Sequence, residues 1–239
     1  MIINYFFYLI NEDNMRFERS AGILLHPTSL PGNFGIGDLG QEAFNFINFL
    51  EHAGQKLWQV FPLGPTGYGD SPYQCFSAFA GNPLLVSPEK LKDDGFLTDS
   101  DLSNIPSYDP HKIDYGSIIN FKKDLFRTAY NNYKNNHNGF EEVFKKFCGD
   151  EKQWLEDFSL FMAAKDFHDG ALWTEWDKEL VLLKENDLKK WKRMTSCGGD
   201  RDLKKFSNLS ISCGLITSAG LMLTGKFPEA HLLPKKEGG

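Results

Sequence analysis

The sequence lacks three features that mark specialised classes of protein: closely spaced cysteines, an excess of basic residues and a long apolar run. Its four cysteines are far apart in the chain (Cys75, Cys148, Cys197 and Cys213), so neither a zinc site nor a disulfide framework is indicated. We therefore expect reduced thiols in a cytoplasmic protein without metal or cofactor. A net charge of −6 argues against nucleic-acid binding, which needs a basic surface. The apolar start, residues 1–10, is too short to span a bilayer, so we expect no membrane partner.

The composition is that of a folded protein, and its first part predicts a strand, a helix and a second strand. Hydrophobic residues make up 41% of the chain and aromatic residues 14%, which is enough for a sizeable core. The apolar runs 21–25 and 57–61 predict strands that are buried on both faces. Residues 41–53 have apolar positions at helical spacing, and Gly54 follows as a stop. We expect a βαβ unit with adjacent parallel strands and a right-handed crossover.

The middle of the chain predicts helices without intervening strands. Residues 84–86 are expected to be a brief extended piece and residues 88–110 a polar, acidic connection. Beyond them, apolar residues recur at helical spacing in three groups: Phe121, Leu125 and Ala129; Phe140, Val143, Phe144, Phe147 and Cys148; Trp154, Leu155, Phe158, Phe161 and Met162. This region is expected to be a helical insertion beside the strands.

The loop that follows the second strand is the most informative part of the sequence. Residues 61–83 are dense in glycine and proline, which fix unusual backbone angles and give the loop a defined shape. The loop contains Tyr68, Asp70, Ser71, Tyr73 and Gln74. Flat aromatic faces beside small donors and acceptors suit a neutral, polyhydroxylated ligand.

Three runs of sequence resemble the amino-terminal part of the 4-alpha-glucanotransferases, also called amylomaltases or disproportionating enzymes. They are GILLHPTSLP (22–31), GIGDLG (35–40) and WQVFPLGPTGYGDSPY (58–73), and the resemblance covers roughly residues 15–194. It implies an α/β fold, an incomplete (β/α)8 TIM-type barrel consisting of the first βα units with a mainly helical insertion. It also implies transfer of alpha-1,4-glucan segments between maltodextrins, with retained anomeric configuration, in carbohydrate metabolism.

The same resemblance implies which residues of the loop bind substrate. The family counterpart of Tyr73 lines the pocket for the scissile glucose, so we rank Tyr73 first, then Ser71 and Asp70. Tyr68 matches a residue of a second glucan-binding groove found in some relatives. Without the resemblance, Tyr73 could be an ordinary turn aromatic, Asp70 a turn residue, and Ser71 a side chain that satisfies backbone groups.

Retaining transfer requires two carboxyl groups about 5–5.5 Å apart, one as nucleophile and one as acid and base. In the family they belong to an Arg-x-Asp-His-Phe strand end and to a Glu on a later strand, aided by an Asp in a His-Asp-Asn run. We find no match for these motifs and assign no catalytic residue in this chain. The expectation is a fragment of the enzyme that is inactive alone; the alternative is a non-catalytic alpha-glucan-binding module.

Two other patterns have competing interpretations. Residues 35–40 match a dinucleotide fingerprint, but they lie too far from the preceding strand for its tight turn. The glycines are therefore expected to shape a loop and cap the next helix. His26 could point into an active site or cap a strand end. Trp154 is expected in the core, whereas Trp173 and Trp176 could bind sugar or seal helices together.

The sequence divides into four parts. Residues 1–14 are expected to be a non-native N-terminal extension, residues 15–90 the first βα units with the substrate loop, and residues 91–194 the helical insertion. From residue 195 the chain is rich in small residues and lacks a periodic apolar face, so residues 195–239 are expected to be an aberrant, disordered tail. A frameshift is the simplest hypothesis for its origin.

Overall fold

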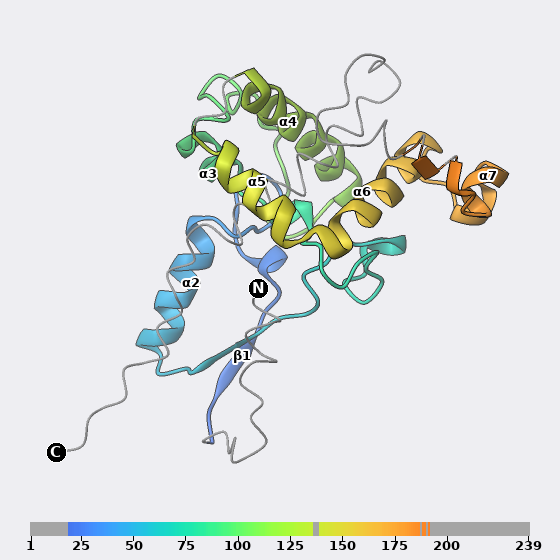
Figure 1. The fold of residues 1–239 in the computed structure, drawn as a ribbon. Coiled ribbons are helices and arrows are strands. Elements are labelled where there is room, and N and C mark those ends of the chain that lie inside the picture. Colours follow the sequence, from blue (N-terminus) through green and yellow to red (C-terminus); the bar gives the residue numbers. More distant parts are fainter. Residues whose placement is uncertain (1–18, 136–138, 187, 190, 192–239) are drawn as a thin grey trace.

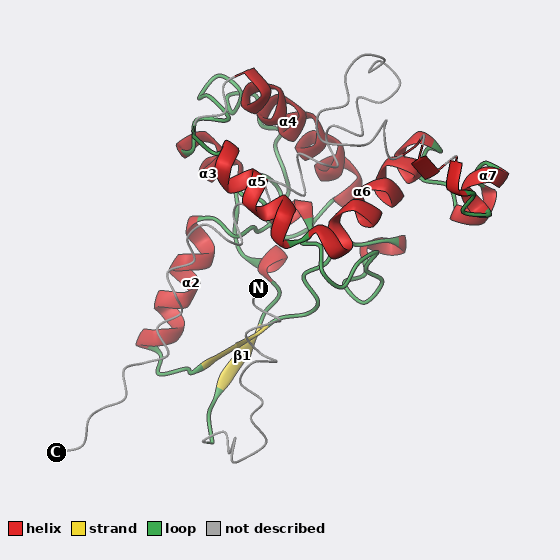
Figure 2. Cartoon of the chain, in the orientation of Figure 1, coloured by secondary structure: helices red, strands yellow, loops and turns green. Residues whose placement is uncertain are grey.

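The computed structural model describes residues 19–135, 139–186, 188, 189 and 191. A short parallel sheet and one helix form one end of the described chain, and a group of helices forms the other (Figures 1 and 2). Strand β1 (Gly22–Leu24) pairs in parallel with β2 (Leu57–Gln59), and helix α2 (Gln41–His52) connects them. The prediction of two adjacent parallel strands joined by a helix is confirmed.

The prediction that both faces of these strands are buried is wrong for the described residues. Leu24 and Leu57 keep 50% and 54% of their surface exposed, while Ile23 and Trp58, which lie opposite one another, are partly covered. Successive side chains of a strand point to opposite faces, and α2 covers only one face. There the Phe46 ring meets the edge of Trp58 at 5.0 Å.

The segment between β1 and α2 is a shaped loop, as its glycines predict. A short 3-10 turn, η1 (Pro27–Ser29), follows β1. Gly35 adopts a positive φ of 78°, a conformation that glycine reaches without strain. Gly40 is the N-cap of α2, and its N–H donates to the Asp38 carboxylate at 2.9 Å. The loop therefore satisfies a helix terminus with its own residues.

Two predictions for the segment after the loop are wrong. Of residues 84–86 only Val86 is extended, because η3 (Pro83–Leu85) is a 3-10 turn whose start is capped by the Asn82 side chain at 2.9 Å from the Leu84 nitrogen. The supposed connection contains a helix, α3 (Pro88–Asp93), with a proline in its first turn and the Ser87 side chain as its cap. Serine followed by proline is a common helix start.

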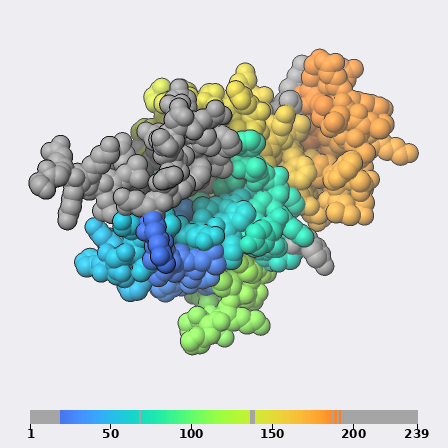
Figure 3. Space-filling view, turned by 90° about the horizontal axis from the view of Figure 1, so that it is seen from below, coloured from blue at the N-terminus to red at the C-terminus, as the bar shows by residue number. Residues whose placement is uncertain are grey.

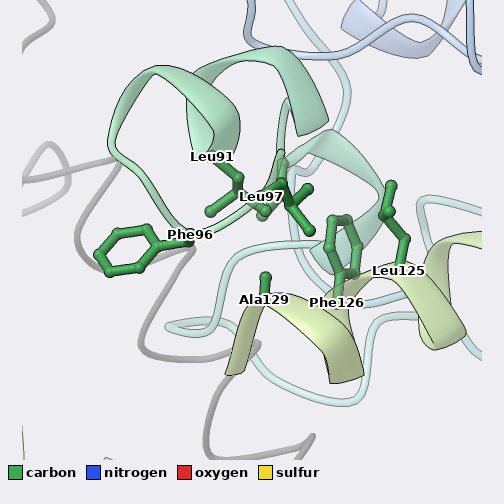
Figure 4. Close-up of a cluster of buried hydrophobic side chains, with 7 residues drawn as sticks. Leu91, Phe96, Leu97, Leu125, Phe126 and Ala129 are labelled. Carbon is green, nitrogen blue, oxygen red and sulfur yellow. The ribbon is translucent and has the colours of Figure 1, made fainter. Parts of the chain in front are cut away.

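The three helices predicted from periodicity are confirmed, and a 3-10 turn and a short helix that the sequence did not predict follow them. They are α4 (Tyr115–Asn135), α5 (Glu141–Asp150), α6 (Lys152–Phe167), the 3-10 turn η4 (Trp173–Glu175) and α7 (Lys178–Val181). The main apolar cluster packs the α3 region against α4 (Figure 4), with Val86, Leu91, Phe96, Leu97, Leu125, Phe126 and Ala129 all buried. The α3 segment therefore belongs to the core.

A second apolar cluster connects the end of the loop to α5 and α6. Ala80 is buried with Phe147, Leu155 and Phe158, and Trp154 packs against this cluster, which confirms the core position predicted for Trp154. Trp176 lies 5.5 Å from both Phe161 and His168 and so seals the end of α6, whereas Trp173 is 56% exposed.

Residues 1–14 and 195–239, to which the sequence assigned an extension and a tail, lie outside the described residues. Of the helices described, none has the length and hydropathy to cross a membrane. No group of three or more His, Cys, Asp or Glu side chains in this part of the chain is arranged to hold a metal ion.

Candidate functional site

The candidate site is the loop of residues 60–82, which starts where β2 ends and finishes at η3. Backbone hydrogen bonds join its two arms: Gly67 N–H to Gln74 O (2.9 Å), Phe76 N–H to Pro65 O (3.0 Å) and Asn82 N–H to Leu63 O (2.7 Å). Figure 3 shows this segment, in teal, against the blue and cyan surface of the first βα unit and beside the yellow surface of the later helices. The loop is therefore a doubled-back structure held by its own backbone.

The tip of the loop is a tight turn that contains two of the predicted site residues. The 3-10 turn η2 (Tyr68–Asp70) has left-handed backbone at Gly69 (φ 66°) and at Asp70 (φ 54°). Aspartate is among the few residues besides glycine that visit this conformation. Partial burial raises the pKa of the Asp70 carboxyl above its ordinary value. The backbone supports the turn-forming interpretation of Asp70, and its carboxylate lies in the same turn as Ser71.

Among the loop aromatics whose side chains the structure describes, Tyr73 is the most exposed, with 72% of its surface accessible. Its backbone N–H donates to the Ser71 hydroxyl oxygen at 3.3 Å, so Ser71 shapes the turn that presents the tyrosine. The Tyr73 ring lies 5.6 Å from the ring of Phe61, tilted by 54°. One side of the tyrosine ring thus packs on Phe61, just beyond the end of β2, and the rest of the side chain is exposed to solvent.

The structure therefore brings Asp70, Ser71 and Tyr73 together at one tip. The Ser71 oxygen serves the backbone, as the structural interpretation predicted, and retains further hydrogen-bonding capacity because a hydroxyl has one donor and two acceptor positions. The side chain of Tyr68 lies outside what the structure describes, so its part in a second groove stays a prediction.

The other side of the loop rests on α6. The Phe76 ring lies 5.8 Å from that of Phe161, and the Lys165 ammonium lies 5.1 Å from the centre of the Phe76 ring. Lys165 also donates to the Gly170 carbonyl at 2.8 Å. The helical region therefore supports the loop directly, and a ligand at the tip would meet a braced structure.

His26 has the capping role that was one of its two interpretations. It is the N-cap of η1: the Thr28 backbone N–H donates to Nδ1 at 3.3 Å, and the Thr28 hydroxyl oxygen lies 2.7 Å from the same nitrogen. Burial lowers the pKa of the imidazole, and the Pro62 backbone opposes this shift. Even so, Nε2 is buried and makes no hydrogen bond of good geometry within the described residues.

Phe61 is the residue at this site that the sequence reasoning missed. The sheet register pairs Ile23 with Trp58 and Leu24 with Gln59, so continuing it by two residues places His26 opposite Phe61. Their rings stack at 6.0 Å with an angle of 21°. Counting along two predicted parallel strands could have found this pair, because both residues lie beyond the carboxyl ends of the strands.

A buried lysine interacts with the segments next to the loop. The Lys122 ammonium of α4 is buried, donates to the carbonyls of Leu84 (2.7 Å) and Val86 (3.1 Å), and lies 3.7 Å from the Asp38 carboxylate. Burial lowers the pKa of Lys122 to about 8, although Asp38 opposes the shift. Burial also raises the pKa of Asp38, against the attraction of Lys122. Lys122 thus connects α4 both to the loop between β1 and α2, which contains Asp38, and to the η3 segment, which contains Leu84.

Fold and site together define an α/β protein that opens with a βαβ unit and presents a braced aromatic loop beyond its strand ends. The chain belongs to the 4-alpha-glucanotransferase family, whose sequence profile matches residues 25–197. Among its relatives, the 4-alpha-glucanotransferase of Synechocystis is 46% identical over 175 residues, and that of Thermus thermophilus is 45% identical over 179 residues.

A solved structure agrees with this assignment. The amylomaltase from Streptococcus agalactiae in complex with acarbose superposes with a TM-score of 0.72 at 32% sequence identity. The superposition covers 86% of this chain and 39% of the amylomaltase. The matches to the Synechocystis and Thermus proteins cover 73% and 74% of this chain, respectively, and 35% of each relative. The chain thus spans about a third of the length of the curated relatives that it matches.

Proposed function

We propose that this chain is the amino-terminal, glucan-binding portion of a cytoplasmic 4-alpha-glucanotransferase of maltodextrin metabolism. In this proposal β1, α2 and β2 are the first units of an incomplete (β/α)8 barrel. Residues 15–90 carry the substrate loop and residues 91–194 form the helical insertion that supports it. The observation that carries the proposal is the Tyr73 ring, which is 72% exposed on a loop held by its own backbone and by two neighbouring elements.

The chemistry of the loop supports an alpha-glucan as the ligand. Sugar rings present apolar C–H faces and hydroxyl groups, which suit an exposed aromatic ring beside a hydroxyl and a carboxylate. Tyr73, Ser71 and Asp70 supply this combination within four residues. The neighbouring amylomaltase structure is a complex with acarbose, which makes that compound a suitable probe.

The proposal includes the absence of transferase activity in this chain by itself. The family mechanism needs a pair of carboxyl groups about 5–5.5 Å apart, and the sequence contains no match for the motifs that carry them. Asp38 has another role, since it pairs with Lys122 and accepts from the Gly40 N–H ahead of α2. Binding without turnover is the expected behaviour.

Two measurements on the 239-residue chain test this function. Incubated with maltotriose, the chain should release no glucose and form no longer maltodextrins when the products are separated by chromatography. Titrated with maltotriose or acarbose and followed by NMR, it should bind with a dissociation constant in the millimolar range, about −4 kcal/mol. Disproportionation by the unaltered chain would overturn the proposed inactivity.

The variant Tyr73→Ala identifies the binding site. We expect it to weaken binding about fivefold, because packing against an aromatic ring contributes on the order of 1 kcal/mol. Phe49→Ala is the matched control, since Phe49 is also an exposed aromatic but lies in α2. Binding that is indifferent to Tyr73→Ala, or equally sensitive to both variants, would remove the loop from the ligand site.

A further inference from the structure

Three aromatic rings form a continuous row from the end of β1 to the tip of the loop. The imidazole of His26 stacks on Phe61 at 6.0 Å and 21°, and Phe61 contacts Tyr73 at 5.6 Å. His26 and Phe61 each follow one of two paired parallel strands, so the sheet fixes the spacing between them. Tyr73 is the member of the row that lies in the Gly- and Pro-rich loop tip, and its ring contacts the strand ends through Phe61.

The contacts of His26 with Thr28 fix the orientation of its ring. Nδ1 lies 3.3 Å from the Thr28 backbone nitrogen and 2.7 Å from the Thr28 hydroxyl oxygen, which leaves Nε2 as the ring nitrogen without a contact to Thr28. That nitrogen is buried, which keeps it out of reach of a ligand at the loop tip. His26 therefore makes no direct contact with a ligand at the loop tip. It can affect such a ligand only through Phe61, on which its ring is stacked.

We propose that His26 is a positioning residue of the glucan site: its ring, stacked on Phe61, fixes the orientation in which Tyr73 is presented. The effect on binding rests on the function proposed above, whereas the effect on Tyr73 in the free protein does not. A ring that is already oriented loses less rotational freedom when a sugar stacks on it, and preorganisation of this kind increases affinity.

Two substitutions separate the cap from the stack. In His26→Asn the Asn oxygen takes the place of Nδ1 as acceptor for Thr28, since Asn is a favoured N-cap, and the ring is lost. In His26→Phe a ring remains against Phe61 and the acceptor is lost. If His26 acts only as a cap, His26→Phe should disturb Tyr73 and binding more than His26→Asn does. If His26 is a positioning residue, His26→Asn should disturb them more.

The first readout is the environment of Tyr73 in the free protein. The chain is labelled with 3-fluorotyrosine, and the 19F resonance of Tyr73 is assigned by its loss in Tyr73→Phe. We expect this resonance to shift and broaden in His26→Asn and to keep its position in His26→Phe. Thermal unfolding should show the reverse order, with His26→Phe lowered by about 2–4 °C for the lost cap.

The second readout is maltotriose affinity by NMR titration. We expect binding to weaken three- to tenfold in His26→Asn and less than twofold in His26→Phe. If the unaltered chain binds no maltotriose, the proposed function fails, and the 19F comparison still decides the positioning role. An unchanged Tyr73 resonance in His26→Asn, or equal shifts in both variants, would overturn the inference.

A third variant keeps the test valid if His26→Asn does not fold. Phe61→Leu retains an apolar side chain at the centre of the row and removes both ring contacts. It should displace the Tyr73 resonance as His26→Asn does, and combining it with His26→Phe should give no rescue. A Tyr73 resonance that is the same in Phe61→Leu as in the unaltered chain would contradict the proposal.

Discussion

Among the described residues, Lys122 is the one charged residue that is fully buried. Its surroundings explain how a charge can be kept there. An ammonium group has three donors. Two of them bind the carbonyls of Leu84 and Val86, and the third side faces Asp38. Leu84 lies in η3 and Val86 lies between η3 and α3. The lysine therefore supplies a hydrogen-bond donor to backbone carbonyls outside the regular helices and strands.

We predict that Lys122→Met lowers the free energy of unfolding by about 2–4 kcal/mol, because it leaves two carbonyls without their donor and removes the cation beside the partly buried Asp38 carboxylate. Urea unfolding followed by circular dichroism measures the change. Lys123→Met is the control. Lys123 is the next residue of the same helix, is partly exposed, and its ammonium lies 3.8 Å from the Asp166 carboxylate. It should cost about 1 kcal/mol or less, and equal losses in both variants would contradict the buried role.

The pH dependence of stability gives a second test at this residue. The pKa of Lys122 is about 8 in the folded chain and about 10.4 in an unfolded one. Between these values the unfolded chain binds more protons, so the contribution of Lys122 to the unfolding free energy rises with pH. The difference in stability between the unaltered chain and Lys122→Met should therefore widen from pH 7.5 to 9.5. A constant or narrowing difference would show that the lysine is not desolvated.

At the same scale, the sequence predicted the residues of the loop tip but not what holds them. Tyr73, Ser71 and Asp70 are adjacent in the chain, so their proximity needs no tertiary information. Phe61 supports Tyr73 from across a turn, and Lys165 reaches Phe76 from a helix far along the chain. Contacts of the second kind depend on packing that no local pattern encodes.

At the scale of elements, periodicity predicted the helices that have an apolar stripe, and it failed where capping residues decide. The start of α3 depends on Ser87 and Pro88, and η3 depends on the Asn82 side chain. In a short segment these local hydrogen bonds outweigh the extended preference suggested by Leu84 to Val86. The β1–β2 pairing was predictable because two apolar runs flank one amphipathic helix, whereas the exposure of one sheet face was not.

The pairing of β1 and β2 depends on a glycine at the first register position. A Cβ on Gly22 would lie 2.5 Å from both the Cβ and the carbonyl oxygen of Leu57, which is its partner in the register. We predict that Gly22→Ala lowers the free energy of unfolding by about 1–3 kcal/mol through overpacking. Because the strain falls on the sheet, hydrogen exchange should also quicken at the Lys56 N–H, which donates to the Ala21 carbonyl.

Gly149→Ala is the matched control for this prediction. Gly149 lies in α5, and a Cβ there would meet nothing within 4 Å. Alanine has the higher helix propensity, so this variant should be more stable by about 0.5–1 kcal/mol. A loss of stability in Gly149→Ala similar to that in Gly22→Ala would show that the effect is not specific to the strand pairing.

At the scale of the whole molecule, the helical region is well packed and the sheet region is open. The cluster of Figure 4 buries seven residues between α3 and α4. By contrast, Leu24 and Leu57 are about half exposed, and Phe49 of α2 is 57% exposed. Parallel sheets are ordinarily covered on both faces. This asymmetry agrees with a chain that spans about a third of its curated relatives, because the described sheet has only two strands.

The open sheet region leads to a prediction about the state of the chain in solution. Unpaired strand edges beside exposed apolar side chains favour association between copies. Sedimentation velocity should therefore show concentration-dependent association of the 239-residue chain, and the double variant Leu24→Lys with Leu57→Lys should reduce it, because charges on a strand oppose edge pairing. Leu182→Lys is the control, since Leu182 is also an exposed leucine, at 64%, but lies at the end of α7. The prediction is wrong if the chain stays monomeric at every concentration. It is also wrong if Leu182→Lys reduces association as strongly as the double variant does, because the sheet face would then not be the association surface.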